Sequence, residues 1–323
     1  MAMSDPYRIL IPYFTRSEWG PLTPLLKVMK EDQRLEAITV PKKMDSLQAI
    51  SDVLAVLAPD MVLCGFDRPE MVPVAYGAYH KHIPIAQIFA GDIAGGAFDD
   101  RDRFVISNYA DLLFCADEKQ MRRVRKATAW RQDLREVEPY CLVSGPTNFD
   151  DMPFSVPGDV PAPFDLVLYN PPSLASEKEI LKELEEIKRV IQYGEPSPGS
   201  VYAYPVVWVA PNGDKYSDLI EDFAIDFSKH FPLGPNLAAT DCHVLWRKTM
   251  PRNEFLGYLA SCNRFIGNSS SMFYEAVYFN VRRVQIGMRN SLREEISKSM
   301  CKQGASKIIC NSIVNYLDVK KNG

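Results

Sequence analysis

The chain has 323 residues, enough for two domains of ordinary size, and its 46% of hydrophobic residues can form a sizeable core. Its formal net charge of −4 argues against nucleic-acid binding, which requires a basic face. The seven cysteines include no CxxC pair, so we expect buried, reduced thiols in a cytoplasmic protein. No run approaches the ~18 apolar residues of a membrane span and no signal core opens the chain, so we expect a soluble protein.

The first 145 residues alternate short apolar runs with helical patterns. We predict strands at 8–14, 35–40, 61–65, 83–89, 112–116 and 140–144, and helices at 21–31, 46–58, 70–81, 104–110 and 117–127. This alternation is typical of a doubly wound parallel sheet, in which ligands bind beyond the carboxyl ends of the strands.

Polar residues follow three of these predicted strands. Arg16 follows the first strand, where a helix-end ion pair is the simpler explanation, and Asp67 and Arg68 follow the third. The fourth strand runs into residues 90–103, a glycine-rich and acid-rich loop whose length suggests function. The basic residues of the helix at 117–127 are expected to form a solvated face.

A second α/β half follows a proline-rich linker at residues 151–163. Its predicted strands are 165–169, 201–209, 243–247 and 282–286, its helices are 176–192, 216–229 and 252–261, and a polar turn lies at 211–214. We therefore expect two Rossmann-like domains with a cleft between them. The expected parts are residues 1–152, residues 164–300, and a C-terminal segment 301–323 that packs back on the first domain.

Residues 265–276 form the turn around which the second half is organised. A short buried strand ends at Gly267, three serines follow, and an apolar run with Glu275 is typical of the first turns of a helix. Such a turn offers backbone N–H groups, hydroxyls and the positive end of a helix dipole, which together suit a phosphate. A serine-capped helix without a ligand is the alternative.

The loop signatures resemble those of the UDP-N-acetylglucosamine 2-epimerases, especially the hydrolysing branch that serves sialic acid and capsule sugars. The resemblance runs from about residue 8 to residue 293 and rests on seven motifs in order: 16–20, 67–71, 91–103, 145–150, 211–214, 267–276 and 286–289. It implies a glycosyltransferase-B-like architecture and a UDP-sugar substrate. It implies no required cofactor, allows magnesium with the diphosphate, and suggests a homodimer.

The resemblance also implies roles for individual residues. In the family a carboxylate removes the proton from C2 of the sugar, UDP leaves by elimination, and water then adds to give the inverted free sugar. By this mapping the acid–base candidates are Asp67, Asp92 and Asp100. The candidates for substrate binding are Arg16, Arg68, Arg103, Asn170, Asn212, Asp214, Asn268, Ser269, Ser270, Ser271, Glu275 and Arg289. Among these, Arg16 would face the diphosphate, Ser269 and Ser270 would hold it, and Glu275 would bind the ribose hydroxyls.

The chain departs from the family pattern at the motif histidines. Asn170, Phe104, Gln87 and Phe89 stand where the family has histidines, and Phe66 and Met272 replace glycines. The two glutamates of the acidic loop are shortened to aspartates, and misplacing a catalytic group by ~1 Å can cost on the order of 100-fold in rate.

Three interpretations are therefore open. The chain is an active 2-epimerase with a rearranged set of acids, a related nucleotide-sugar enzyme with another substrate or transfer reaction, or an inactive binding subunit.

Overall fold

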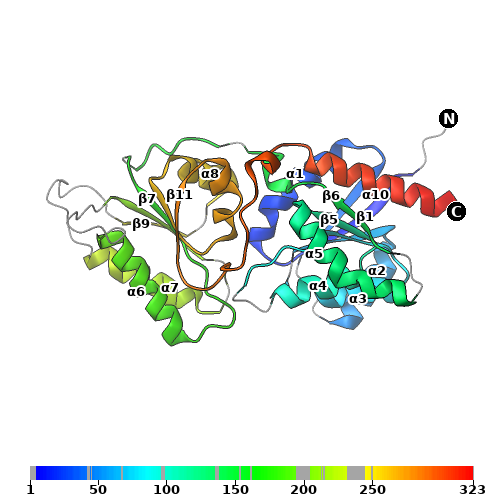
Figure 1. Cartoon of the computed structure of the whole chain (residues 1–323), viewed down its shortest axis with the longest axis horizontal. Helices are drawn as coiled ribbons and strands as arrows, with labels where there is room; N and C mark the ends of the chain where they lie inside the picture. The colour runs from blue at the N-terminus through cyan, green and yellow to red at the C-terminus, as the bar shows by residue number, and fades with distance from the viewer. Residues whose placement is uncertain are drawn as a thin grey trace. The chain divides into compact units, whose positions relative to one another are not determined.

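The computed structural model divides into two compact α/β units (Figure 1). It describes residues 5–41, 44, 46–66, 68–95, 99–134, 138–152, 154–160, 162–193, 204–211, 213, 215–230, 244–248 and 250–322. The first unit comprises Met1–Ile93, Phe98–Asp151 and Ile296–Gly323, and the second comprises Ala94–Ala97 and Met152–Glu295. The C-terminal segment thus packs with the first half of the chain, from which it is remote in sequence.

The first unit is built on a six-stranded parallel sheet in the order β2-β1-β3-β4-β5-β6. Its strands are β1 (Tyr7–Tyr13), β2 (Leu35–Pro41), β3 (Met61–Gly65), β4 (Ile85–Ile88), β5 (Leu112–Cys115) and β6 (Tyr140–Val143). Its helices are α1 (Arg16–Glu31), α2 (Leu47–Leu57), α3 (Met71–His80), α4 (Asp99–Tyr109), α5 (Glu118–Thr128) and α10 (Ala305–Asn322), with short turns η1 (Ala129–Leu134), η2 (Thr147–Phe149) and η4 (Lys298–Met300).

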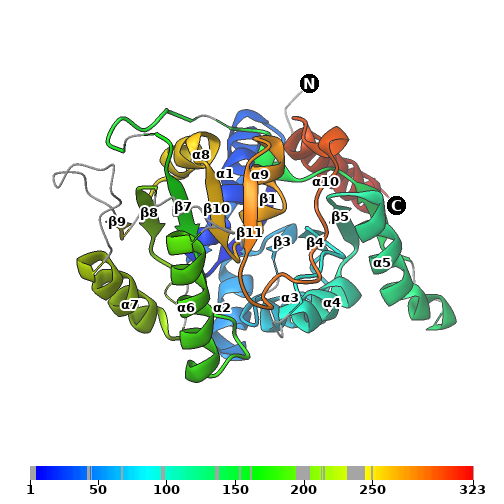
Figure 2. The ribbon, with the colours of Figure 1, turned by 60° about the vertical axis from the view of Figure 1, so that its left-hand side comes forward.

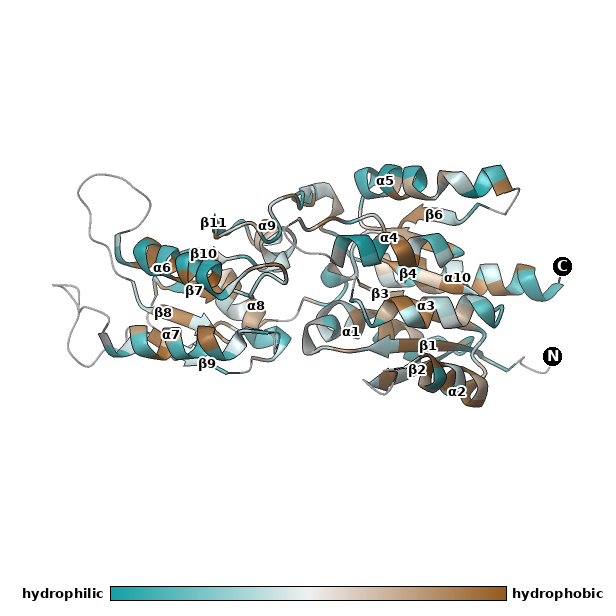
Figure 3. Cartoon of the chain, turned by 90° about the horizontal axis from the view of Figure 1, so that it is seen from below, coloured by the Kyte–Doolittle hydropathy of each residue, from teal (hydrophilic) through white to brown (hydrophobic). Residues whose placement is uncertain are grey.

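Helices cover both faces of this sheet. The helices α2, α3, α4 and α5 pack side by side along one face, and α1 packs with α10 on the other (Figure 1). Strands β3, β4 and β5 are buried along their whole length, as continuous apolar runs in a parallel sheet require. Apolar residues of the helices pack against them, and these helices carry apolar, brown stretches in Figure 3.

The second unit is built on a five-stranded parallel sheet in the order β11-β10-β7-β8-β9. Its strands are β7 (Asp165–Leu168), β8 (Val206–Val209), β9 (Val244–Arg247), β10 (Arg264–Gly267) and β11 (Arg282–Gln285). Its helices are α6 (Glu177–Tyr193), α7 (Ser217–His230), α8 (Arg252–Ser261) and α9 (Glu275–Tyr278), with the turn η3 (Ser270–Met272). Helices α6 and α7 lie on one face, and α8 and α9 lie on the other (Figure 2).

The strand orders locate the point in each sheet where ligands are expected. The order in which strands are added to the sheet reverses between the parallel neighbours β1 and β3 in the first sheet, and between β7 and β10 in the second. At such a switch point the connections leave to opposite sides, so a crevice opens beyond the carboxyl ends of the two strands. The two doubly wound sheets confirm the predicted fold class.

The predicted strands and helices of the two sheets are confirmed, but three of them begin five residues away from the predicted start. Helix α1 begins at Arg16 rather than at residue 21, because Thr15 and Glu18 form a capping box that holds the first turn despite Pro21 and Pro24. Helix α4 begins at Asp99 rather than at 104, so the second half of the predicted acidic loop is helical. Strand β8 begins only at Val206, after a proline that cannot donate to the ladder; residues 201–203 of the predicted strand lie outside the described part.

The C-terminal helix is anchored by Asp150, the aspartate that closes the motif at 145–150. Its carboxylate accepts the backbone N–H groups of Gly304 at 2.5 Å, Ala305 at 3.0 Å and Ser306, which are the orphan donors at the start of α10. Asp150 thus has a structural role here. No helix of the described residues is long and apolar enough to cross a membrane.

Candidate functional site

The predicted site residues fall into two groups, one in each unit, and each group lies at the carboxyl edge of its own sheet. The first unit carries Arg16, Arg68, Asp92, Asp100 and Arg103, and the second carries Asn170, Asn268, the three serines, Glu275 and Arg289. Asp67, Asn212 and Asp214 lie outside the described residues, as does the side chain of Arg16.

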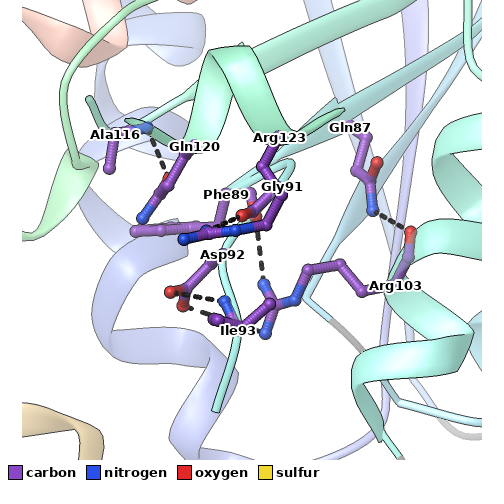
Figure 4. A network of polar contacts seen from close by, with 9 residues as sticks. All are labelled: Gln87, Phe89, Gly91, Asp92, Ile93, Arg103, Ala116, Gln120 and Arg123. Atoms are coloured by element: carbon purple, nitrogen blue, oxygen red, sulfur yellow. Dashed lines mark hydrogen bonds and ion pairs between the residues drawn. The ribbon is translucent and has the colours of Figure 1, made fainter. Parts of the chain in front are cut away.

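Asp92 and Arg103 form the buried charged pair of the first unit (Figure 4). Their side chains are 5% and 3% exposed, and Arg103 Nη2 lies 3.9 Å from Asp92 Oδ2. Arg103 Nη1 also donates to the Phe89 carbonyl at 3.0 Å, and Asp92 Oδ1 accepts the Ile93 N–H at 2.9 Å. Each of the two carboxylate oxygens of Asp92 therefore faces a positively polarised group.

The start of α4 places Arg103 toward Asp92. Gln87 Nε2 donates to the Arg103 carbonyl at 3.0 Å, and the Ser107 hydroxyl donates to Gln87 Oε1 at 2.6 Å. All three residues are at least nine-tenths buried, so this hydrogen-bonded group fixes the helix on strand β4. Gln87 stands where the family has a histidine, and its amide serves this packing.

The loop before Asp92 is held by helix α5. Gly91 has a φ of +75°, and a Cβ there would lie 2.2 Å from the Gln120 carbonyl, so the loop approaches α5 as only glycine allows. Arg123 Nη1 donates to the Gly91 carbonyl at 2.5 Å (Figure 4). Arg122, Arg125 and Lys126 form the solvated face that was predicted, whereas Arg123 binds the acidic loop.

Asp100 and Arg68 are two further candidates of the first unit. Asp100 lies half-buried in the first turn of α4, which corrects the expectation of a loop residue. Arg68 Nε lies 3.5 Å from a carboxylate oxygen of Glu70. His80 and His82 are exposed.

Glu18 is a buried carboxyl that the sequence interpretation did not single out. It is 3% exposed, and its Oε2 accepts the N–H groups of Phe14 at 2.6 Å and Thr15 at 2.7 Å. Burial raises the pKa of this carboxyl, against the opposing influence of those backbone groups and of Arg68. The capping-box spacing between Thr15 and Glu18 could have identified the residue.

Phe66 and Phe89 directly follow the adjacent strands β3 and β4, and both have left-handed backbones, with φ of 71° and 54°. Their rings stack with centroids 5.7 Å apart and planes at 21°. The left-handed region costs a residue with a side chain about 1–2 kcal/mol, so two such residues cost about 2–4 kcal/mol. Ring stacking contributes about 0.5–1.5 kcal/mol beyond burial, so it does not by itself offset this strain.

In the second unit Asn268 joins the ends of β10 and β7. Its side-chain oxygen accepts the Asn170 N–H at 2.8 Å, and its side-chain nitrogen donates to the Asn170 carbonyl at 2.8 Å. The preceding Gly267 has a φ of +141°, and a Cβ there would lie 2.0 Å from the Leu168 carbonyl oxygen. Glycine is therefore required at the predicted turn because the two strands meet there backbone to backbone.

The three serines follow Asn268. The long helix predicted after them is not formed, which corrects the prediction. Ser270–Met272 form one short turn, Tyr274 breaks it at φ −116° and ψ −84°, and Glu275–Tyr278 form a helix of four residues. Such short turns have almost no dipole, so any phosphate held here would depend on hydroxyls and turn N–H groups rather than on a helix end. The Ser270 side chain is exposed and Ser269 is buried.

Glu275 is held by an arginine that the sequence interpretation missed. Arg252 Nη1, at the start of α8, donates to Glu275 Oε1 at 3.0 Å, and the Glu275 side chain is 3% exposed. No local pattern connects residues 23 positions apart on two helices, so only the fold reveals the pair. Met272, which stands where the resemblance expects a glycine, is buried in the unit.

Arg289 and Asn290, which follow β11, form hydrogen bonds with the loops at the carboxyl edge of the second sheet. Arg289 Nη1 donates to the Pro171 carbonyl at 2.7 Å, and Asn290 Nδ2 donates to the Asn268 carbonyl at 2.6 Å. Asn290 N–H also donates to the Gly95 carbonyl at 3.1 Å. Asn170, Asn268 and Asn290 thus brace three loops of this edge with amide hydrogen bonds.

A cavity of about 440 Å³ lies beside this edge in the second unit. Its lining residues come from α6, the loop before it and the turn after β11: Pro172, Leu174, Ala175, Glu179, Lys182, Glu183, Glu186, Gly287 and Met288. Burial raises the pKa of Glu183, which accepts the Tyr169 hydroxyl at 2.6 Å. Three glutamates against one lysine make this cavity unsuited to a diphosphate.

Two doubly wound units with their polar candidates at the carboxyl edges define a two-domain, glycosyltransferase-B-like α/β protein. The model of the UDP-N-acetylglucosamine 2-epimerase family matches residues 39–321, and the chain belongs to this family.

Two curated relatives carry more specific names. The chain is 26% identical over 253 residues to a UDP-N,N′-diacetylbacillosamine 2-epimerase (hydrolyzing) of Legionella pneumophila, covering 77% of this chain and 61% of that protein. It is 24% identical over 256 residues to a GDP/UDP-N,N′-diacetylbacillosamine 2-epimerase (hydrolyzing) of Campylobacter jejuni, with the same coverage. The chain thus spans about three fifths of the length of these relatives.

Solved structures of the family share the fold. A Staphylococcus aureus MnaA–UDP complex has a TM-score of 0.67 at 15% identity, covering 96% of this chain and 90% of that chain. A Neisseria meningitidis UDP-GlcNAc 2-epimerase bound to UDP-GlcNAc has a TM-score of 0.65 at 12% identity, covering 95% of this chain and all of that one.

Proposed function

We propose that the chain is a hydrolysing UDP-sugar 2-epimerase that eliminates UDP from a UDP-linked 2-acylamino sugar and inverts C2. Membership of the 2-epimerase family supports the reaction class. The observation that carries the assignment to this chain is the buried Asp92–Arg103 pair at the carboxyl edge of the first sheet. A carboxylate that is both buried and oriented is what proton removal from a weakly acidic carbon requires.

The proposed reaction has two balanced steps. In the first, a carboxylate takes the C2 proton, the C1–C2 double bond forms, and the C1–O bond breaks with its electron pair going to UDP. In the second, water adds its hydroxyl to C1 and a proton returns to C2 from the other face. Asp92 is the proposed base, and Asp67 and Asp100 are the proposed partners in proton transfer.

Binding of UDP is assigned to the second unit. The serine turn after Gly267 offers an exposed hydroxyl at Ser270 beside a braced backbone, and Glu275 is the proposed partner of the ribose hydroxyls. Arg252 fixes the direction of that carboxylate. Arg16 is proposed to face the diphosphate, whose charge a guanidinium matches in a bidentate manner.

The finer properties are also proposals. UDP-N-acetylglucosamine and UDP-N,N′-diacetylbacillosamine are the two candidate substrates, and the product would feed sialic-acid-like or capsular sugars. The reaction is redox-neutral acid–base chemistry, so we propose that it needs no cofactor, with magnesium as an aid to the diphosphate. We also propose that the protein forms a homodimer and is located in the cytoplasm. The six cysteines of the described residues are all free thiols, and thiols stay reduced in that compartment.

The test follows both substrates in deuterated water. The wild-type protein is expected to release UDP and to place deuterium at C2 of the free sugar, and both are expected to continue after EDTA is added because magnesium is not required. Asp92→Asn is expected to lower the release rate by about 100-fold or more while UDP binding persists, since the base is lost and the nucleotide site is not. Asp52→Asn, at an exposed position on α2, is the matched control.

Other outcomes would contradict this proposal. Glycosyl transfer to an added acceptor without deuterium exchange would favour a different nucleotide-sugar enzyme. Binding of UDP with no release from either substrate would favour an inactive binding subunit. A wild-type rate in Asp92→Asn would refute the role of that carboxylate.

A further inference from the structure

Two peptide groups flank Asp92, and hydrogen bonds hold both of them (Figure 4). In the group that joins Gly91 to Asp92, the carbonyl accepts Arg123 Nη1 at 2.5 Å. The N–H of the same group donates to the Phe89 carbonyl at 3.4 Å. In the next group, the Ile93 N–H donates to Asp92 Oδ1 at 2.9 Å. These contacts fix the direction in which the Asp92 side chain leaves the backbone.

Helix α5 gives Arg123 a fixed starting point. The Asp117 carboxylate accepts the Gln120 N–H at 2.8 Å, and Gln120 Oε1 accepts the N–H of the residue before Asp117 at 2.9 Å, so side chains close the first turn. Gln120, Arg123 and Val124 lie on one face of the helix, since residues three and four apart are neighbours. The loop packs directly on this face: a Cβ at Gly91 would lie 2.2 Å from the Gln120 carbonyl oxygen and 3.2 Å from Val124 Cβ.

Arg123 differs from the other basic residues of α5. Its neighbours Arg122, Arg125 and Lys126 are exposed to solvent. The Arg123 side chain is half-buried and reaches the loop. Hydrogen bonds from an ionised donor are shorter and stronger than those between neutral groups. The Gly91 carbonyl, held by a guanidinium on a capped helix, is therefore a fixed point next to Asp92.

We propose that Arg123 is a positioning residue for the base of the reaction. By holding the Gly91 carbonyl, it sets the peptide group that carries Asp92, and with it the direction from which the carboxylate approaches C2 of the sugar. The inference rests on the proposed function, in which Asp92 removes the C2 proton. Displacing a catalytic group by about 1 Å costs on the order of 100-fold in rate, so the contact of Arg123 acts on proton removal and not on binding of the nucleotide.

The test compares Arg123→Ala with Arg122→Ala, because both remove a cation from α5 and only the first removes the contact with the Gly91 carbonyl. UDP release is measured with whichever of the two candidate nucleotides the wild-type protein uses, well below the Tm of each variant, where the folded fraction is close to one. The kcat of Arg123→Ala is expected to fall by about 10- to 100-fold. Its KM and its Kd for UDP are expected to stay within about 3-fold, as for a group that acts only in the transition state. Arg122→Ala is expected to keep all three values.

Two further measurements separate positioning from a loss of packing. Arg123→Lys keeps a charged donor on a long side chain and is expected to recover part of the lost kcat, whereas Arg123→Met keeps a long side chain without a donor and is expected to be as slow as Arg123→Ala. Guanidinium ion, added to Arg123→Ala far below the concentrations that unfold proteins, is expected to raise kcat in a saturable manner. The same addition is expected to leave the kcat of Arg122→Ala unchanged.

A wild-type kcat in Arg123→Ala, or equal kcat values in Arg123→Lys and Arg123→Met, would overturn the inference while the proposed function stands. The comparison of Arg123→Lys with Arg123→Met decides the question even if Arg123→Ala does not fold. A loss of UDP affinity at unchanged kcat would also overturn the inference, because it would place Arg123 in nucleotide binding. Failure of the wild-type protein to release UDP from either nucleotide would instead overturn the proposed function, and the inference with it.

Discussion

Gly267→Ala is the sharpest test of the turn between β10 and Asn268. An added Cβ would lie 2.0 Å from the Leu168 carbonyl oxygen and 2.7 Å from its carbon, and these are backbone atoms of the neighbouring strand β7. Restoring ordinary contact requires β10 to withdraw by about 1 Å in a close-packed interior, at about 1–3 kcal/mol. The positive φ of +141° adds about 1–2 kcal/mol for a residue with a side chain.

The expected loss is therefore about 2–5 kcal/mol of unfolding free energy, which lowers the Tm of a unit of this size by roughly 4–20 °C. Binding of UDP should weaken as well, because the displaced strand carries Asn268 away from Asn170. Scanning calorimetry and titration calorimetry with UDP measure the two effects. Gly158→Ala, where a Cβ meets nothing within 4 Å, is the control and should leave both unchanged.

A Gly267→Ala protein with wild-type Tm and wild-type UDP affinity would refute this reasoning. It would mean that the two strands tolerate separation at the turn, and that the turn does not need its close backbone approach to bind nucleotide.

Two further predictions concern buried charges. Asp165 and Arg264 pair at the first residues of β7 and β10, with Arg264 Nε 3.0 Å from Asp165 Oδ1 and both residues under 5% exposed. Asp165→Ala should cost about 3–5 kcal/mol in urea unfolding, whereas Asp165→Leu combined with Arg264→Met should cost far less, since no charge is left unpaired; equal losses would contradict this. Burial raises the pKa of Glu18 above 4.5, so the folded protein binds the proton of this carboxyl more tightly than the unfolded chain does. The resulting contribution to the free energy of unfolding is fully present below pH 4.5 and is lost as the pH rises through the raised pKa. Glu18→Gln should therefore gain stability relative to wild type across that window, and a pH-independent difference between the two melting curves would argue against a raised pKa.

Local patterns predicted the elements well because helix and strand periodicities depend on near neighbours. The corrections arise where one short-range signal overrides another. The apolar spacing from Leu22 onward suggested that α1 starts at residue 21, yet the capping box of Thr15 and Glu18 begins the helix earlier. The apolar run after the serines suggested a longer helix, but Tyr274 breaks it.

The sequence by itself determined the two α/β halves, the glycine and serine turn after β10, and the carboxylate and arginine positions that mark the family. These features lie in short stretches, where residue type and spacing act directly on the backbone. The sequence also showed which family histidines are replaced, but not what the replacements do.

Tertiary structure alone decided which of these residues meet. The neighbouring positions of β7 and β10 join Asn170 to Asn268, and the start of α4 turns Arg103 toward Asp92. The stacking of Phe66 on Phe89 depends on two strands that end at the same level. Such contacts join residues from 11 to nearly 100 positions apart, and they form only because burial of the whole sheet selects one strand order, a choice that no local pattern encodes.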